Sequence, residues 1–186
     1  DIQTYRALGE MQRVARPEGH SLARFGHNMV PVRHDHASQT SPIFNYPYAR
    51  SREALAQLQK QEAPDAWLGH KLRYINPLTG GSPMPTISTN LQLLPKGFAG
   101  KTHRATDGTV YSVVEGQGSA EIAGQRFEFG PRDTFVVPSW APLRLHAPNG
   151  DCVLFSFSDR PVQQAMGILR EAFLEAVRGE DVLCED

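Results

Sequence analysis

Short apolar runs separated by turn residues fill the stretch from residue 110 to residue 158, and they constrain the fold more than any other feature of this chain. The runs are VYSVVEG, GSAEIAG, QRFEFG, DTFVVPSW, LRLHAP and CVLFSFS, broken by Gly, Pro and Asn-Gly. In the last run Phe155 and Phe157 alternate with Ser156 and Ser158, the two-residue period of a β-strand. Many short strands at regular spacing predict an antiparallel barrel or sandwich with an all-β core.

The residues ahead of this stretch predict an arm with short helices over 1–85. Apolar residues of 1–16 fit one helical stripe, whereas 17–50 is rich in Pro, His, Asn and Ser and is predicted to be irregular. Ser51 is a candidate N-cap for a helix from Arg52 to about Lys60, with Leu55 and Leu58 facing inward. KLRYINP and TISTNLQLLPKG are predicted to be strands joined by a turn-rich loop. The barrel itself is expected over 86–160.

A helix is predicted to follow the last strand over 161–178, with a tail over 179–186. Asp159 is its candidate cap, Pro161 lies in its first turn, and Gly179 fits its end. Its apolar stripe would consist of Val162, Met166, Leu169, Phe173 and Val177.

The charge, the apolar runs and the cysteines of the chain argue against several kinds of binding partner and cellular location. A net charge of −1 and a pI near 6.7 argue against a nucleic acid or an anionic membrane surface. No apolar run reaches the length of a membrane span, and the first residues lack the pattern of a signal peptide. Two cysteines, Cys152 and Cys184, favour a reducing cytoplasm over a disulfide framework. The chain begins with Asp rather than Met, which suggests a piece of a longer protein.

The spacing in GFAGKTHRATDGTVYSVVEGQG resembles the first motif of the cupin family, whose fold is a double-stranded β-helix or jelly-roll barrel. Gly97, His103 and Gly116 fall in register with that motif, but its second His and its Glu are replaced by Ala105 and Thr109.

The second motif is similarly altered in GPRDTFVVPSWAPLRLHA. Pro138 is in place, whereas the two Gly positions hold Arg132 and Trp140, and the His and Asn positions hold Leu143 and Ala147. A non-haem Fe(II) site needs at least three nitrogen or carboxylate ligands. We therefore expect no metal and no catalytic residue in this chain.

A vestigial pocket is the remaining candidate site, made of His103, Tyr111, Trp140 and His146. The large aromatic residues could fill the space that metal and substrate would otherwise take, and Trp140, where the motif has Gly, is a candidate plug. His146 follows Leu143 by an odd number of residues and is expected to point to the opposite face of a straight strand. His34 and His36 form the only His-x-His, but they lie in an irregular arm with no supporting ligand nearby.

Several longer strings resemble the carboxyl-terminal half of gentisate 1,2-dioxygenases, from about Leu22 to Val177. They are SPIFNYPYARSREAL, KLRYINPLTGGSPMPT, LQLLPKGF, TDGTVYSVVEGQG, GPRDTFVVPSWAP and LFSFSDRPVQQAMG. The family is one of bicupin ring-cleaving dioxygenases, with salicylate and 1-hydroxy-2-naphthoate dioxygenases as close relatives.

The resemblance implies a parent enzyme that converts gentisate and O2 to maleylpyruvate at an Fe(II) bound by an amino-terminal cupin domain, outside this chain. It also implies a tetramer in which this portion is structural and oligomerising.

Two other hypotheses stay open. The chain could be a stand-alone, metal-free cupin that acts as a binding or assembly module. It could also be a sugar-isomerase-like or sensor cupin, which would require an open polar cavity beside His103.

Overall fold

The computed structural model describes residues 17–34, 38–43 and 45–175. Its helices are α1 (His20–Phe25), α2 (Tyr48–Gln61) and α3 (Arg160–Ala165). Its strands are β1 (His70–Arg73), β2 (Ser88–Leu94), β3 (Phe98–Ala99), β4 (His103–Ala105), β5 (Thr109–Glu115), β6 (Gly118–Ile122), β7 (Gln125–Phe129), β8 (Thr134–Val137), β9 (Leu143–Ala147), β10 (Cys152–Ser158) and β11 (Glu171–Phe173). The helix predicted over 1–16 lies outside the described residues.

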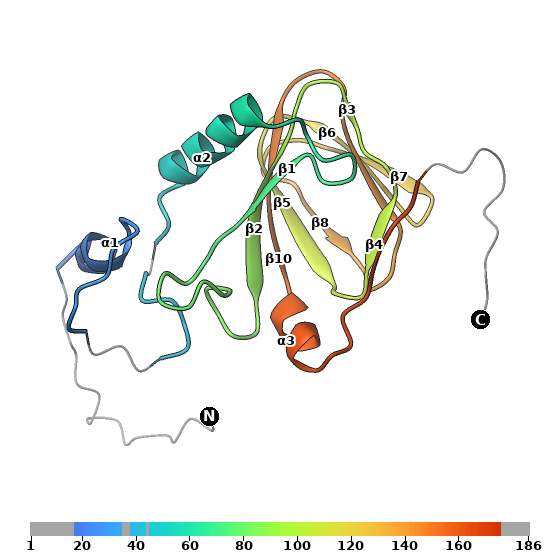
Figure 1. Cartoon of the computed structure of the whole chain (residues 1–186). Helices are drawn as coiled ribbons and strands as arrows, with labels where there is room; N and C mark the ends of the chain where they lie inside the picture. Colours follow the sequence, from blue (N-terminus) through green and yellow to red (C-terminus); the bar gives the residue numbers. More distant parts are fainter. Residues whose placement is uncertain (1–16, 35–37, 44, 176–186) are drawn as a thin grey trace, which may run out of the picture.

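The strands form two antiparallel sheets that face each other as a barrel (Figure 1). One sheet has the order β1-β2-β10-β5-β8, and the other has the order β11-β4-β9-β6-β7, with β3 paired to β9. All the strands predicted between Val110 and Ser158 are present, so the predicted all-β core is confirmed. β1 and β11 extend the sheets beyond the range 86–160 expected for the barrel.

The core between the sheets is made of side chains that alternate along the strands. On β9, Leu143, Leu145 and Ala147 are buried inside the barrel, whereas Arg144 and His146 between them are more exposed. β10 shows the same period, but its serines and not its phenylalanines point inward: Ser156 is fully buried, whereas Phe157 is 39% exposed.

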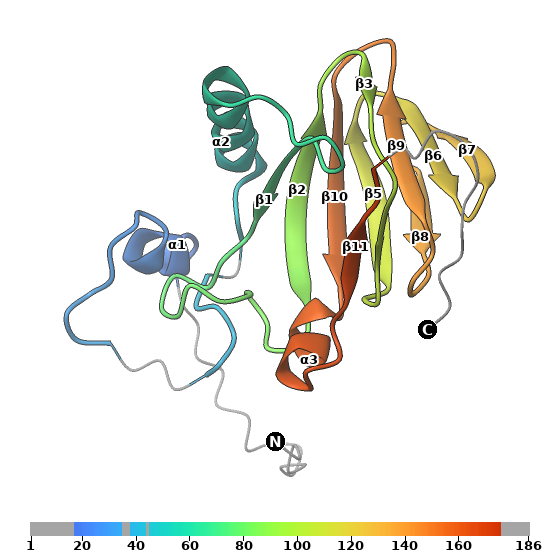
Figure 2. The ribbon, with the colours of Figure 1, turned by 45° about the vertical axis from the view of Figure 1, so that its right-hand side comes forward.

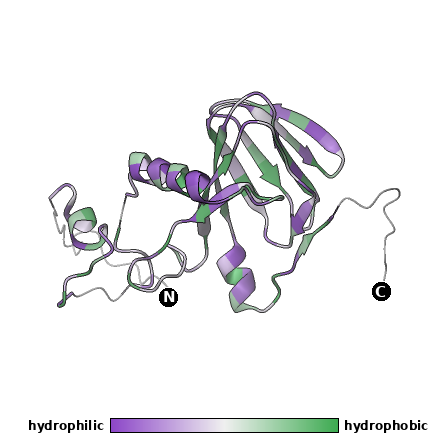
Figure 3. Ribbon diagram, turned by 45° about the horizontal axis from the view of Figure 1, so that its top comes forward, coloured by the Kyte–Doolittle hydropathy of each residue, from purple (hydrophilic) through white to green (hydrophobic). Residues whose placement is uncertain are grey.

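A second apolar cluster lies outside the barrel, where α2 covers the face of β1 and β2 (Figure 2). Leu55, the only buried residue of α2, packs there with Leu91, Leu93 and Val153. The rest of α2 is largely hydrophilic (Figure 3), as expected for a helix that buries one stripe.

The start of α2 differs from the sequence prediction. The helix begins at Tyr48, its N-cap is Pro47, and Ser51 lies within its first turn, where its Oγ is 3.4 Å from the Pro47 carbonyl oxygen. Ser51 as N-cap is therefore wrong. Pro47 has φ of −58°, and its carbonyl oxygen accepts from the backbone N–H groups of Arg50 and Ser51, so the helix begins there without a capping side chain.

The carboxyl-terminal helix is much shorter than predicted. α3 ends at Ala165, and Gly167 adopts a left-handed φ of 71°, the usual way for a helix to end at glycine. Residues 171–173 then pair with β4 as β11, which places Phe173 on a strand. The prediction of one helix over 161–178 is wrong, because Gly167 ends α3 although the 3–4 spacing of apolar residues continues beyond it. Val177 and Gly179 lie outside the described residues.

Candidate functional site

The first motif folds into the β3–β5 region with its glycines in their expected conformation. Gly97 and Gly116 have φ of 80° and 75°. A Cβ on Gly116 would lie 2.2 Å from the Asp151 carbonyl oxygen, so the backbone approach at this position requires glycine.

The two altered glycine positions of the second motif keep a glycine-like backbone. Arg132 has φ of 77° and Trp140 has φ of 63°. This left-handed region costs an ordinary residue about 1–2 kcal/mol. The loops before and after β8 have therefore kept their geometry although the residues that best suit it have been lost.

The positions of the metal ligands line one small cavity of about 20 Å³. Its lining includes His103, Ala105, Thr109, Tyr111 and Leu143. About 10–15 Å³ suffices for one water molecule, so the cavity has no room for an aromatic acid. Tyr111 stacks on Phe135 at 5.0 Å between ring centroids, and Phe135 stacks on Phe129 in turn.

The four candidate pocket residues do not meet in one place. His103 and Tyr111 line the cavity. The Trp140 ring instead lies 4.6 Å from the Arg104 guanidinium and is 39% exposed, so it does not plug the interior. His146 lies on the face of β9 opposite the buried Leu143, and it pairs with Ser119 on β6.

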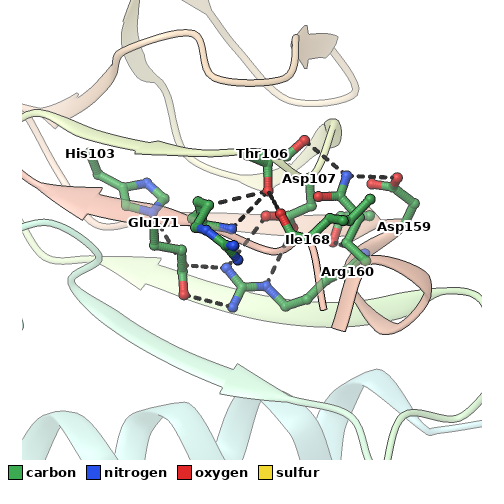
Figure 4. A network of polar contacts seen from close by, with 10 residues as sticks. His103, Thr106, Asp107, Asp159, Arg160, Ile168 and Glu171 are labelled. Atoms are coloured by element: carbon green, nitrogen blue, oxygen red, sulfur yellow. Dashed lines mark hydrogen bonds and ion pairs between the residues drawn. The ribbon is translucent and has the colours of Figure 1, made fainter. Parts of the chain in front are cut away.

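An ion-pair network lies beside His103 (Figure 4). Arg160, the first residue of α3, contacts Asp107 at 3.4 Å, and its Nη1 donates to Glu171 Oε2 at 2.9 Å. A second hydrogen bond joins Arg160 Nη2 to Glu171 Oε1. The Asp107 side chain is only 5% exposed, so Arg160 neutralises a carboxylate that is nearly out of water.

His103 sits at the edge of this network. Its Nε2 lies 3.5 Å from Glu171 Oε1, too long for a strong hydrogen bond. Burial lowers the pKa of His103, and the charge of Lys71 lowers it further. The pKa of the neighbouring Glu171 carboxyl is also lowered, mainly by the hydrogen bond that Arg160 donates to it. The arrangement is a neutral imidazole beside a carboxylate that is already paired with Arg160.

These residues do not fit an iron ion. His103 is the one nitrogen ligand left at a motif position, because Ala105 and Leu143 have no donor atoms and Thr109 offers a hydroxyl instead of a carboxylate. Within residues 17–34, 38–43 and 45–175, no group of three or more His, Cys, Asp or Glu side chains could hold a metal. His34 Nδ1 contacts the Pro31 carbonyl oxygen at 3.1 Å, and His36 lies outside the described residues.

The network was not predicted from the sequence. Asp107, Arg160 and Glu171 are distant along the chain, and no motif links them. The sequence predicted a helix after Ser158 but not the pairing of residues 171–173 with β4. That pairing brings Glu171 next to Arg160.

A larger open cleft of about 380 Å³ lies at the other end of β5, lined in part by Gln117, Glu128, Asp133 and Asn149. None of the motif's metal-ligand positions lines it. No helix among the described residues is long and apolar enough to cross a membrane.

Two facing antiparallel sheets with both motifs in their loops define a cupin barrel, and solved structures agree with this class. Salicylate 1,2-dioxygenase from Pseudaminobacter salicylatoxidans matches 82% of this chain and 45% of its own with a TM-score of 0.76 and 31% identity.

Comparison with curated sequences then gives the family. Gentisate 1,2 dioxygenase 1 of Aquipseudomonas alcaligenes is 52% identical over 163 residues, covering 88% of this chain and 47% of the relative. The 5-aminosalicylate 1,2-dioxygenase of a Comamonas species is 36% identical over 76% of this chain and 38% of the relative. No family model matches the chain. The chain belongs to the gentisate 1,2-dioxygenase family of ring-cleaving dioxygenases. It spans about half the length of the relatives it matches, as expected for one half of a two-barrel protein.

Proposed function

We propose that this chain is the carboxyl-terminal, metal-free half of a gentisate 1,2-dioxygenase. The parent enzyme would convert gentisate and O2 to maleylpyruvate at an Fe(II) bound by residues outside this chain. The single observation that carries the proposal is the 52% identity to a gentisate 1,2-dioxygenase over 88% of this chain, in a barrel without iron ligands. A related salicylate 1,2-dioxygenase has been solved with gentisate adducts, which supports the substrate class.

The role of this half would be architectural. Only about 20 Å³ is left beside His103, so the motif positions offer no chamber for a substrate. We propose that it packs against the amino-terminal cupin domain and contributes to a cytoplasmic tetramer.

Oxygen uptake tests the proposal directly. Loaded anaerobically with Fe(II), this chain alone should bind no stoichiometric iron and show no gentisate-dependent uptake, whereas the full-length protein should show both. The full-length protein without this half should lose the tetramer in light scattering. Failure of the full-length, iron-loaded protein to consume any hydroxylated benzoate would sink the proposal.

A stand-alone binding or assembly module is the second candidate. It is favoured by one observation: both sheets and the core between them are complete within this chain. An upstream His-x-His barrel motif in the same reading frame of the gene would count heavily against it.

A further inference from the structure

Strand β1 directs a lysine into the barrel. His70 is 3% exposed, and Leu72 packs against the apolar cluster beneath α2, outside the barrel. Successive residues of a strand point to opposite faces, so Lys71 between them faces the interior. It is paired with Gln92 of β2, which is fully buried.

The Lys71 ammonium lies next to the cavity at the motif positions. Its Nζ is 5.7 Å from the centroid of the Tyr111 ring, and Tyr111 lines that cavity together with His103. Among the described residues no carboxylate lies within ion-pair distance of Lys71. The ammonium is therefore half-buried and held by an aromatic face instead of an anion.

Buried acceptor atoms without partners lie on the strands around it. Gln92 Oε1 and Ser156 Oγ are both buried and make no hydrogen bond. Gln92 is directly across from Lys71, and Ser156 is directly across from Tyr111. Lone pairs of this kind attract a cation, directly or through a water molecule.

We propose that the ammonium of Lys71 adds positive charge beside the vacant ligand positions of the motif and thereby keeps a divalent ion out. The inference extends the proposed metal-free role of this half but does not depend on the activity of the parent enzyme.

Restoring the metal ligands of the motif tests whether Lys71 keeps a divalent ion out. The triple variant Ala105→His, Thr109→Glu and Leu143→His, made in this chain, would rebuild the motif around His103. With Co²⁺ alone as probe, we expect its Kd to be at least about 100-fold weaker than in the same variant carrying Lys71→Met, because a nearby ammonium repels a divalent ion strongly in a half-buried site. Equal Kd values in the two folded variants would overturn the proposal.

A second measurement needs no rebuilt site. In the native background Lys71→Met should raise the pKa of His103 in an NMR titration, whereas the exposed Lys96→Met should leave that pKa unchanged. An unchanged pKa of His103 in Lys71→Met would show that the ammonium does not act at the motif position, and it would overturn the proposal even if the rebuilt variants fail to fold. Neither readout involves ring cleavage, so failure here is distinct from failure of the proposed function.

Discussion

Arg160 and Glu171 form a two-pronged ion pair that ties the first residue of α3 to the first residue of β11. The same guanidinium reaches Asp107 in the loop between β4 and β5. One side chain thus joins three segments that are separate in the sequence, and it fixes how the chain returns to the barrel after α3.

Replacing Arg160 with Ala should therefore destabilise the barrel by about 2 kcal/mol, because it leaves the nearly buried Asp107 carboxylate unpaired. Urea denaturation would measure the change. Arg126→Ala is the matched control, since the Arg126–Glu128 pair is 64% and 71% exposed and should contribute less than about 1 kcal/mol. Equal losses in both variants would contradict a special role for Arg160.

The Glu171 carboxylate should make stability depend on acid. Its pKa lies below the ordinary value of 4.5 in the folded chain, mainly because Arg160 donates to it. A lowered pKa gives stability that is present above the unfolded pKa and lost as the pH falls through the folded one. The difference in unfolding free energy between the wild type and Glu171→Gln should thus be constant near pH 7 and shrink below about pH 4.5. A difference that grows on acidification would refute this assignment.

His103 should make the free energy of unfolding depend on pH in a second range, at higher pH than Glu171 does. Burial lowers its pKa below the ordinary 6.5, so the unfolded chain binds the proton first as the pH falls. Stability should decline as the pH drops below about 6.5, and His103→Gln should flatten that decline. Parallel pH profiles for wild type and His103→Gln would show that another group is responsible.

Arg132 has a left-handed backbone conformation, so replacing it with glycine should stabilise the protein. Its φ is 77° and it is exposed, so Arg132→Gly should relieve backbone strain and raise the free energy of unfolding by about 1 kcal/mol. Arg132→Ala removes the same side chain but keeps the strain. Thermal unfolding of the two variants separates the effects, and a Gly variant no more stable than the Ala variant would be the contrary result.

The two motif glycines should differ in their tolerance of alanine. Both have positive φ, but a Cβ on Gly116 would meet the Asp151 carbonyl oxygen at 2.2 Å, whereas one on Gly97 would meet nothing within 4 Å. We expect Gly97→Ala to cost about 1 kcal/mol and Gly116→Ala about 3 kcal/mol or more in unfolding free energy. Similar costs for both would mean that the backbone near Asp151 yields easily.

Local patterns account for the parts of the fold that the sequence predicted correctly. The strands between Val110 and Ser158 were recognisable because they are short apolar runs broken by Gly, Pro and Asn-Gly, which are short-range signals. The loss of the metal ligands could be seen at Ala105, Thr109 and Leu143, because motif spacing is a property of the chain alone.

The sequence by itself determined the β-strands, the family and the vacant ligand positions of this protein. Only the tertiary structure decided that residues 171–173 form a strand paired with β4, although their apolar spacing favours a helix. It also decided that Lys71 faces Tyr111 inside the barrel. Helical spacing is a local preference of modest energy, and pairing with an open strand edge can outweigh it once Gly167 has ended α3. Contacts between residues far apart in the chain depend on how the sheets close, and no local pattern encodes them.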